Sequence, residues 1–301
     1  FFGLMMGDVV YAAIIMVFAN RGLHLFVDDP ESEGFKLFQR ILYISGGVAI
    51  VIGVLTGTYL GNFLYEFFGI QNLAVAPGLE ELLINPMSFI VLSLIIGLVH
   101  VNIAHVLALI KGIKEGQKEV ILGKAGLFIL QIAGIPWIMH AILHVDIPLF
   151  TAQIYSILLY VMALGLILVI ASSIMQKGVF LGGIFWLFDV TGLLGDVMSY
   201  CRLAGVGLAT FYLASCFNLI AGLLYGMVPA GIARLIGGTL LAIIVLLIGH
   251  ALNLVLAGIT CFVHSLRLCF VEFLFKFYEG GGREYSPFRL RRRSLFVGGK
   301  A

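Results

Sequence analysis

Polar residues follow one face of the last long apolar stretch of the chain, Ile243 to Tyr278. They recur there at intervals of three or four residues, which is the spacing of one face of an α-helix. With Ala257 filling the gap in this stripe, its positions are His250, Asn253, Thr260, His264 and Arg267. An arginine inside an apolar span costs roughly 2.5 to 3.5 kcal/mol on membrane-insertion scales. The stripe therefore predicts that Arg267 has a specific function.

A second polar stripe lies in the preceding apolar stretch, Asp189 to Asn218. Asp196, Ser199 and Arg202 are each three residues apart and share a helical face, which Asp189 extends backwards. The chain thus embeds two arginines without a matching density of membrane carboxylates. A partner subunit that carries the missing negative charge would explain this excess.

Apolar runs of about 20 residues recur along the whole chain, which is typical of a polytopic α-helical membrane protein. The candidate spans are Gly3–Asn20, Leu37–Phe63, Met87–Ile110, Val120–Leu143, Phe150–Met175, Val179–Met227 and Ile232–Tyr278. The last two are longer than a simple crossing requires, so we expect them to be tilted or broken. We predict an all-α fold with a helix bundle over 1–178, two long arginine-bearing helices over 179–278 and a basic tail over 279–301.

Composition supports the membrane assignment, because 61% of the 301 residues are hydrophobic, 11% are charged and the mean hydropathy is +1.11. The net charge of +2 is too small to indicate a nucleic-acid partner. The four cysteines lie in apolar runs without a CxxC pair, and we interpret them as small residues buried in the membrane. The chain carries neither a Walker A string nor a GxSxG string, so we expect no ATP hydrolysis by this chain, and no cofactor or metal ion.

Loop charges predict which side of the membrane each connection faces. Lysines are concentrated between Lys111 and Lys124 and at Lys177, and the tail after Tyr278 is rich in arginine, so we expect these segments in the cytoplasm. The connection from Tyr65 to Asn85 carries glutamates but no lysine or arginine, and it should face outward. By parity Phe1 is also outside, and one further crossing would precede it.

Three strings carry a family resemblance: "FFGLMMGD" from Phe1, "GDVMSYCRL" from Gly195 and "HALNLVLAGITCFVHSLRLCFVEFLFKFYEGGG" from His250. In order and spacing they resemble the membrane domain of the large stator subunit of V/A-type rotary ATPases. That subunit is called a in vacuolar enzymes and I in bacterial and archaeal ones. The resemblance runs from Phe1 to about Phe288. It implies a membrane domain of eight spans, about seven of them present here, and a soluble N-terminal arm that we expect outside this sequence.

The resemblance implies a role for both arginines. In that family two long tilted helices face a rotating ring of proteolipid subunits, and their arginines meet the buried carboxylate of each ring subunit. By motif these arginines are Arg202 in "SYCRL" and Arg267 in "HSLRL". An arginine favours the ionised carboxylate and stays protonated, so it discharges the ring site and separates two ion half-channels. Whether the ion is a proton or sodium stays open, as does the relative importance of the two arginines.

Supporting roles are expected for seven further polar residues, each of which has a structural role as its alternative. His264, one turn before Arg267, would orient the guanidinium or bond the ring carboxylate. Asp8 would support the site or stabilise a helix bend. The candidates for lining the water paths are Asp196, Ser199, His250, Asn253 and Glu272.

Besides the ring and the lipid bilayer, the implied partners are the central-stalk adaptor and the peripheral-stalk subunits, which the N-terminal arm would contact. Short loops and the absence of glycosylation sequons favour a multi-pass protein of a bacterial or archaeal cell membrane with a cytoplasmic C-terminus. Two alternative functions differ in the sequence features that they require. A secondary transporter with an internal midplane site would show paired repeats, which are not evident here. A purely structural membrane anchor would leave the two arginine stripes unexplained.

Overall fold

The computed structural model describes residues 1–22, 32–70, 73–141, 151–229, 231–232, 234–278 and 280–281. Within these residues the chain is helical, and its β-pairing is limited to an isolated bridge between Tyr59 and Asn62. The chain is therefore an all-α polytopic membrane protein, as the apolar runs predict. Nearly all of the basic tail expected over 279–301 lies outside the described residues.

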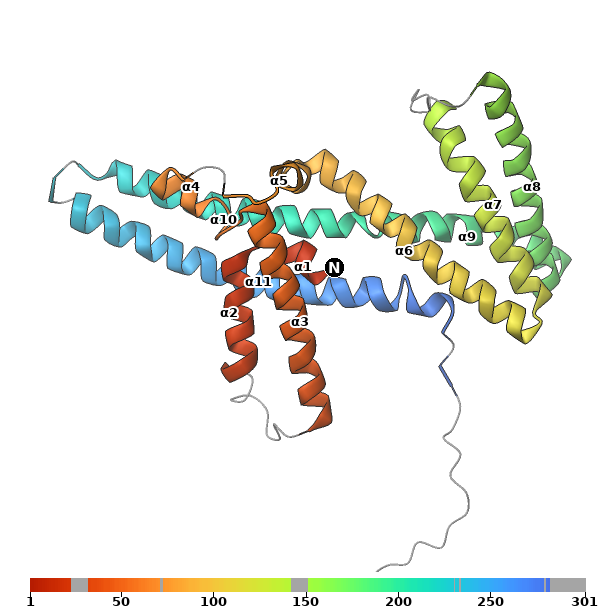
Figure 1. Ribbon diagram of the computed structural model, residues 1–301, viewed down its shortest axis with the longest axis horizontal. Coiled ribbons are helices and arrows are strands. Elements are labelled where there is room, and N and C mark those ends of the chain that lie inside the picture. The colour runs from red at the N-terminus through yellow and green to blue at the C-terminus, as the bar shows by residue number, and fades with distance from the viewer. Residues whose placement is uncertain are drawn as a thin grey trace, which may run out of the picture.

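The helices follow one another with short connections (Figure 1). They are α1 Phe2–Met6, α2 Val9–Val17, α3 Glu33–Thr56, α4 Phe63–Phe68, α5 Pro77–Ile84, α6 Pro86–Glu115, α7 Lys118–Ala141, α8 Ala152–Lys177, α9 Val179–Met198, α10 Cys201–Met227 and α11 Thr239–Phe270. Three short π or 3₁₀ segments complete the set, namely η1 Phe18–Gly22, η3 Arg234–Gly238 and η4 Leu274–Lys276.

Six helical segments of the described chain are long and apolar enough to cross a membrane. They match the last six predicted spans and are Glu33–Thr56, Pro86–Glu115, Lys118–Trp137, Gln153–Lys177, Val179–Met227 and Arg234–Lys276. The first predicted span, Gly3–Asn20, differs from the prediction because it is divided. Gly7 adopts a left-handed conformation (φ 46°) that ends α1, and Asp8 caps the start of α2, so only a shorter apolar helix, Val9–Gly22, follows.

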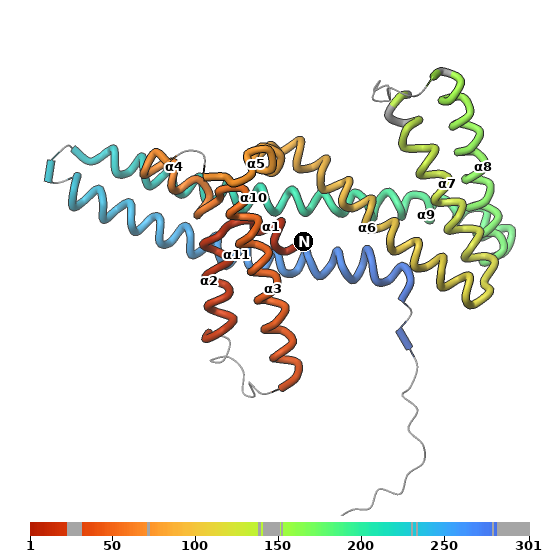
Figure 2. Tube along the Cα trace, viewed as in Figure 1, coloured from red at the N-terminus to blue at the C-terminus, as the bar shows by residue number. Residues whose placement is uncertain are grey.

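The two longest segments lie side by side and run in opposite directions along the long axis of the molecule (Figures 1 and 2). The first is broken as predicted, because α9 ends at Met198 and α10 begins at Cys201 after a turn at Ser199 and Tyr200. α6 packs against both halves of the broken segment, and α7 and α8 form a hairpin beside α9. α2 and α3 pair with each other and extend away from α11 (Figure 2).

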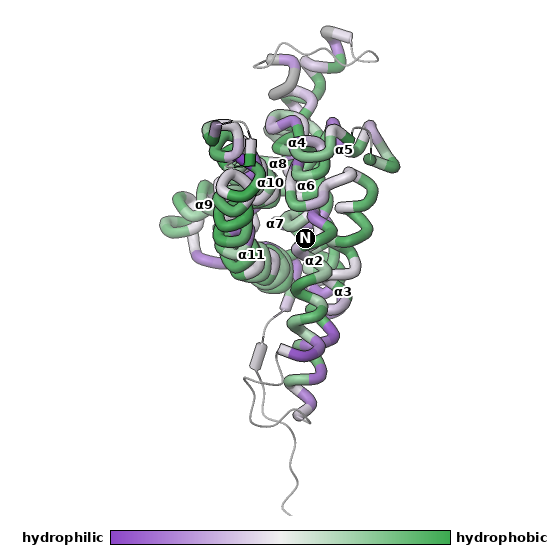
Figure 3. Tube along the Cα trace, turned by 90° about the vertical axis from the view of Figure 1, so that its left-hand side faces the viewer, coloured by the Kyte–Doolittle hydropathy of each residue, from purple (hydrophilic) through white to green (hydrophobic). Residues whose placement is uncertain are grey.

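Most residues along the helices are hydrophobic, and hydrophilic ones gather at the free ends of α2 and α3 (Figure 3). Large apolar side chains are exposed along α11, among them Leu247 and Ile259, while Asn253 on the same helix is buried. The chain therefore presents apolar faces outward and keeps polar groups inside. Such a surface suits lipid or a neighbouring membrane subunit.

α6 approaches the start of α10 closely at Gly97. A Cβ atom on Gly97 would lie 2.5 Å from Cγ and 2.7 Å from Cβ of Tyr200, which is fully buried. A residue without a side chain is therefore required where the two helices meet.

Replacing Gly97 with alanine is expected to lower the free energy of unfolding by about 1–3 kcal/mol, because the added methyl group overpacks this contact. Gly47→Ala in α3 is the matched control, since nothing lies within 4 Å of its added Cβ. Helix propensity alone would make the control neutral or stabilising. Detergent-induced unfolding of both variants measures the difference, and equal stability would contradict the packing argument.

Candidate functional site

Both stripe arginines meet one buried carboxylate. Arg202 Nη2 donates to Oε1 of Glu272 at 3.1 Å, and Arg267 Nε lies 3.6 Å from the same oxygen. The Glu272 side chain is 2% exposed, whereas those of Arg202 and Arg267 are 23% and 57% exposed. We name these three residues the arginine cluster. Two guanidinium groups share one carboxylate, so the cluster carries one more positive charge than negative.

Helix ends bring the arginine cluster together. Arg202 lies in the first turn of α10 and Arg267 in the last turn of α11. α11 ends at Phe270, and the turn over residues 271–273 places Glu272 back against both arginines. Within the described part of the chain, Glu272 Oε2 and Arg202 Nη1 are buried without a hydrogen-bond partner. Such atoms are costly to leave unpaired, so the cluster has unused hydrogen-bonding capacity.

The other predicted polar residues near the arginine cluster each have contacts of their own. Asp196 forms an ion pair with Lys276, whose ammonium comes from the segment after α11. Ser199 ends α9 as its C-cap residue, and its carbonyl oxygen accepts from the Arg202 backbone N–H at 3.3 Å. His264 is half-buried, and its Nδ1 has no hydrogen-bond partner among the described residues. His264 therefore lies beside Arg267 on α11 with one ring nitrogen unused.

Aromatic side chains pack together next to Arg202 and Glu272 in the chain. The His100 ring stacks on Phe273 with centroids 4.2 Å apart and an interplanar angle of 11°. His100 Nδ1 is 2.5 Å from the hydroxyl of Tyr200, and Phe1 meets the rings of both His100 and Tyr200 edge-on. These contacts join α6, the α9–α10 turn and the segment after α11. They hold the backbone just before Arg202 and just after Glu272 in place.

His250 and Asn253 belong to a different group of hydrogen bonds. The Tyr11 hydroxyl lies 2.6 Å from His250 Nδ1 and accepts from Asn253 Nδ2 at 3.1 Å. His250 Nε2 is 2.9 Å from Asn218 Oδ1, and Asn253 also donates to the Thr210 carbonyl at 3.0 Å. At 1.5 Å per residue, Asn253 lies about 21 Å along α11 from Arg267. The structure therefore does not bring these two candidates to the arginine cluster.

Tyr11→Phe is expected to lower the free energy of unfolding by about 1–3 kcal/mol, because His250 and Asn253 lose a shared buried partner. Tyr160→Phe in α8 is the control, since that residue is 70% exposed. Unfolding of the two variants in the same detergent series compares them. A Tyr11 variant as stable as the Tyr160 variant would show that the bonds carry no net stability.

Asp8 lies at the helix bend. Its Oδ1 accepts from the backbone N–H groups of Val10 at 2.9 Å and Tyr11 at 3.1 Å, which caps α2. Its Oδ2 accepts from Gly61 N–H at 2.9 Å and so ties α2 to the turn after α3. Leu60 and Gly61 both have positive φ in that turn. The Asp8 carboxylate thereby holds a strained turn against the start of α2. These contacts correspond to the structural role predicted as an alternative for Asp8, the stabilisation of a helix bend.

Sequence reasoning missed Tyr11, Tyr200 and Lys276 as partners of the predicted residues. Tyr11 and His250 are 239 residues apart, so no local pattern links them. Tyr200 stands inside the string "SYCRL", and Lys276 is a lone charge near the end of an apolar stretch. The sequence could therefore have pointed to Tyr200 and Lys276. It could not have pointed to Tyr11, because the contact of Tyr11 with His250 depends on how α2 lies against α11.

Comparison with known proteins agrees with the motifs. The V-type ATPase 116 kDa subunit family matches residues 190–290. A-type ATP synthase subunit I of Methanocaldococcus jannaschii is 36% identical over 97% of this chain and 44% of its own length. The A-type subunit I of Pyrococcus abyssi is 29% identical over 97% of the chain and 42% of its own length. V-type ATP synthase subunit I of Borreliella burgdorferi is 27% identical over 97% of the chain and 48% of its own length.

The chain spans less than half the length of these relatives. Its similarity to them covers almost all of its own residues, and the matched family segment contains both Arg202 and Arg267. These similarities confirm the resemblance that the motifs predict: the chain is similar to the V-type ATPase 116 kDa subunit family over residues 190–290 and, over 97% of its length, to subunit I of A-type and V-type ATP synthases.

Proposed function

We propose that this chain is the ion-translocating membrane part of the stator of a V/A-type rotary ATPase. It would form two ion half-channels against a ring of proteolipid subunits and use Arg202 and Arg267 to discharge the carboxylate of each ring subunit. Ion flow, of protons or sodium, would then be coupled to rotation. The chain itself would not hydrolyse ATP.

The arginine cluster is the observation that carries this proposal. Glu272 neutralises one of the two guanidinium groups, and one positive charge remains. Arg267 is more than half exposed on a helix whose outer face is apolar. An apolar partner with one buried carboxylate would explain both the remaining positive charge and the exposed apolar face, because it would cover that face and balance that charge.

The proposed chemistry follows from the guanidinium group. Arginine remains protonated at any physiological pH, so it stabilises the ionised ring carboxylate without accepting its proton. A ring carboxylate that reaches Arg267 would therefore release its ion into one half-channel and, after passing, load from the other. Because Glu272 already accepts from Arg202, the incoming carboxylate would compete with an internal one, which limits how tightly it is held.

The polar residues would divide between the two half-channels. Asp196, Ser199 and His264 are the candidates on the side of the arginine cluster, where Asp196 and Lys276 also line a cavity of about 330 Å³. His250 and Asn253 are the candidates on the opposite half of α11. Their bonds to Tyr11 and Asn218 would have to open for an ion to pass.

Site-directed crosslinking tests the ring-facing surface. Single cysteines at Val263 and Phe270, which flank Arg267 and are 52% and 48% exposed, would be introduced into full-length protein lacking Cys201, Cys216, Cys261 and Cys269. Membranes with all subunits of the complex would be crosslinked and analysed by mass spectrometry. We expect products with a small proteolipid that carries a buried carboxylate.

Ile132 in α7, which is 71% exposed, is the control position away from the arginine cluster. It should give no proteolipid product. If cysteines at Val263 and Phe270 also gave only intrachain or lipid products, the stator proposal would be rejected. The arginines would then form an internal site, as in a secondary transporter.

A further inference from the structure

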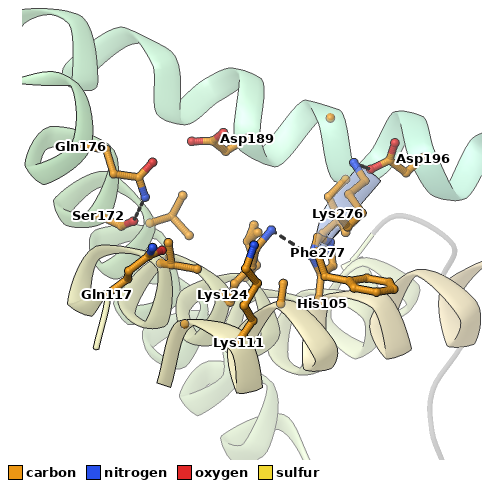
Figure 4. Close-up of a pocket in the computed structure, with 18 of the residues that line it drawn as sticks. His105, Lys111, Gln117, Lys124, Ser172, Gln176, Asp189, Asp196, Lys276 and Phe277 are labelled. Carbon is orange, nitrogen blue, oxygen red and sulfur yellow. Dashed lines mark hydrogen bonds and ion pairs between the residues drawn. The ribbon is translucent and has the colours of Figure 1, made fainter. Parts of the chain in front are cut away.

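The residues that follow α11 contact the broken helix on both sides of its break, which is the turn between α9 and α10. Before the break, Asp196 of α9 pairs with Lys276, whose ammonium lies beside the Asp196 carboxylate (Figure 4). After the break, Arg202 of α10 donates to Glu272 at 3.1 Å. One short segment therefore joins the two halves of the broken helix. We name this segment, residues 272–276, the strap.

A third contact fixes the strap to α6. The Phe273 ring stacks on the His100 ring with centroids 4.2 Å apart and an interplanar angle of 11°. His100 Nδ1 lies 2.5 Å from the hydroxyl of Tyr200, which is in the break itself. Tyr200 is fully buried, and an added Cβ on Gly97 of α6 would lie 2.5 Å from its Cγ. α6 therefore contacts both the strap and the break, and these parts move relative to one another only if the contacts open.

The backbone hydrogen bonds at the break are those of a tight turn. Tyr200 N–H donates to the Val197 carbonyl at 3.0 Å. Arg202 N–H donates to the Ser199 carbonyl at 3.3 Å, so both bonds span three residues rather than the four of an α-helix. The Tyr200 side chain makes no capping bond at the start of α10, and an added Cβ on Gly195 would meet none of the described residues within 4 Å. We therefore expect the angle between α9 and α10 to depend on tertiary contacts.

We propose that the strap holds α9 and α10 at one angle and thereby positions Arg202, with Lys276 and Phe273 as positioning residues. Arg202 follows the break directly, so a change in this angle moves its guanidinium group. Asp196 would then anchor the strap, which is the structural alternative to lining a water path. The effect on ion pumping rests on the proposed stator function, whereas the effect on the angle does not.

Distances measured by pulsed electron paramagnetic resonance test the angle directly. Spin labels would be attached at Leu187 in α9 and Leu219 in α10, both 51% exposed, in full-length protein that lacks its native cysteines. Lys276→Met and Phe273→Leu are each expected to shift or broaden the distance distribution. Phe275→Leu is the matched control, because this phenylalanine also lies in the strap but is 67% exposed. It should leave the distribution unchanged.

A charge swap separates the ion pair from the two residues taken singly. Asp196→Lys/Lys276→Asp rebuilds the pair with opposite polarity and should restore the wild-type distance distribution. In the assembled complex, Lys276→Met is expected to lower the number of ions pumped per ATP hydrolysed roughly tenfold, because small displacements of a reacting group are costly. The swap and the conservative variant Lys276→Arg should both recover most of this ratio.

Wild-type distance distributions in both Lys276→Met and Phe273→Leu would overturn the proposal, whatever their pumping ratios. A swap that restores the distances but not the pumping would also overturn the positioning role, and would assign Asp196 to the ion path. Retained pumping in Arg267→Ala would instead reject the stator function. The distances would still decide whether the strap sets the angle between α9 and α10.

Discussion

Arg267→Ala is expected to abolish ATP-driven ion pumping in an otherwise assembled complex, with a fall to below a tenth of the wild-type rate. The reason is a charge count within the arginine cluster. Without Arg267, the single remaining guanidinium of Arg202 is neutralised by Glu272 at 3.1 Å, and no positive charge is left for an incoming carboxylate. Pumping in membrane vesicles, measured with a pH-sensitive or sodium-sensitive dye, gives the rate.

Two variants sharpen this test. Arg267→Lys keeps the charge but loses the planar fork of donors, so an intermediate rate is expected. Arg234→Ala removes an arginine at the far end of the same helix pair, where its side chain bonds the carbonyl oxygens of Gly226 and Val228. That variant should pump at a rate close to wild type. Coupled pumping that survives in Arg267→Ala would show that the exposed guanidinium is not needed.

Glu272→Gln is expected to lower the free energy of unfolding by about 3 kcal/mol, since breaking a buried ion pair leaves an uncompensated charge. Arg202 accounts for most of this effect because it is the less exposed and the closer partner. Detergent titration followed by circular dichroism measures the change. Glu81→Gln is the control, because Glu81 is an exposed carboxylate in α5 and should change stability little.

A double-mutant cycle assigns the effect to the ion pair. Arg202→Gln combined with Glu272→Gln removes both charges, so the double variant should be more stable than the sum of the two single changes implies. A coupling energy of at least about 1 kcal/mol is the expected result. Strictly additive effects would mean that Arg202 and Glu272 do not stabilise each other, despite their 3.1 Å contact.

Much of the fold follows from local pattern. Apolar runs located six spans, and α6 is bounded by local caps: the Asn85 side chain accepts from backbone N–H groups at its start, and the Gly116 N–H donates to backbone oxygens at its end. The first span was harder to predict, because its apolar composition hides a break at Gly7 and Asp8. The caps at this break are local, but Asp8 also accepts a hydrogen bond from Gly61, which lies 53 residues away.

The candidate site was likewise predictable from the sequence only in part. Helical spacing placed Arg202 and Arg267 on polar stripes, and the resemblance named both. Spacing gave no sign that Glu272 sits between them, because Arg202 and Glu272 are 70 residues apart and Glu272 follows the end of α11. Nor did it separate His250 and Asn253 from the arginine cluster, because both share a helical face of α11 with Arg267.

The sequence by itself determined that this is a helical membrane protein with two arginine-bearing stripes, because hydrophobicity and helical period are properties of neighbouring residues. Only the tertiary structure decided which charges meet. The shared carboxylate of Glu272, the bonds of Tyr11 and the ion pair of Asp196 with Lys276 each join helices far apart in the chain. Such contacts arise from how apolar faces pack, and many packings are compatible with one pattern of apolar positions.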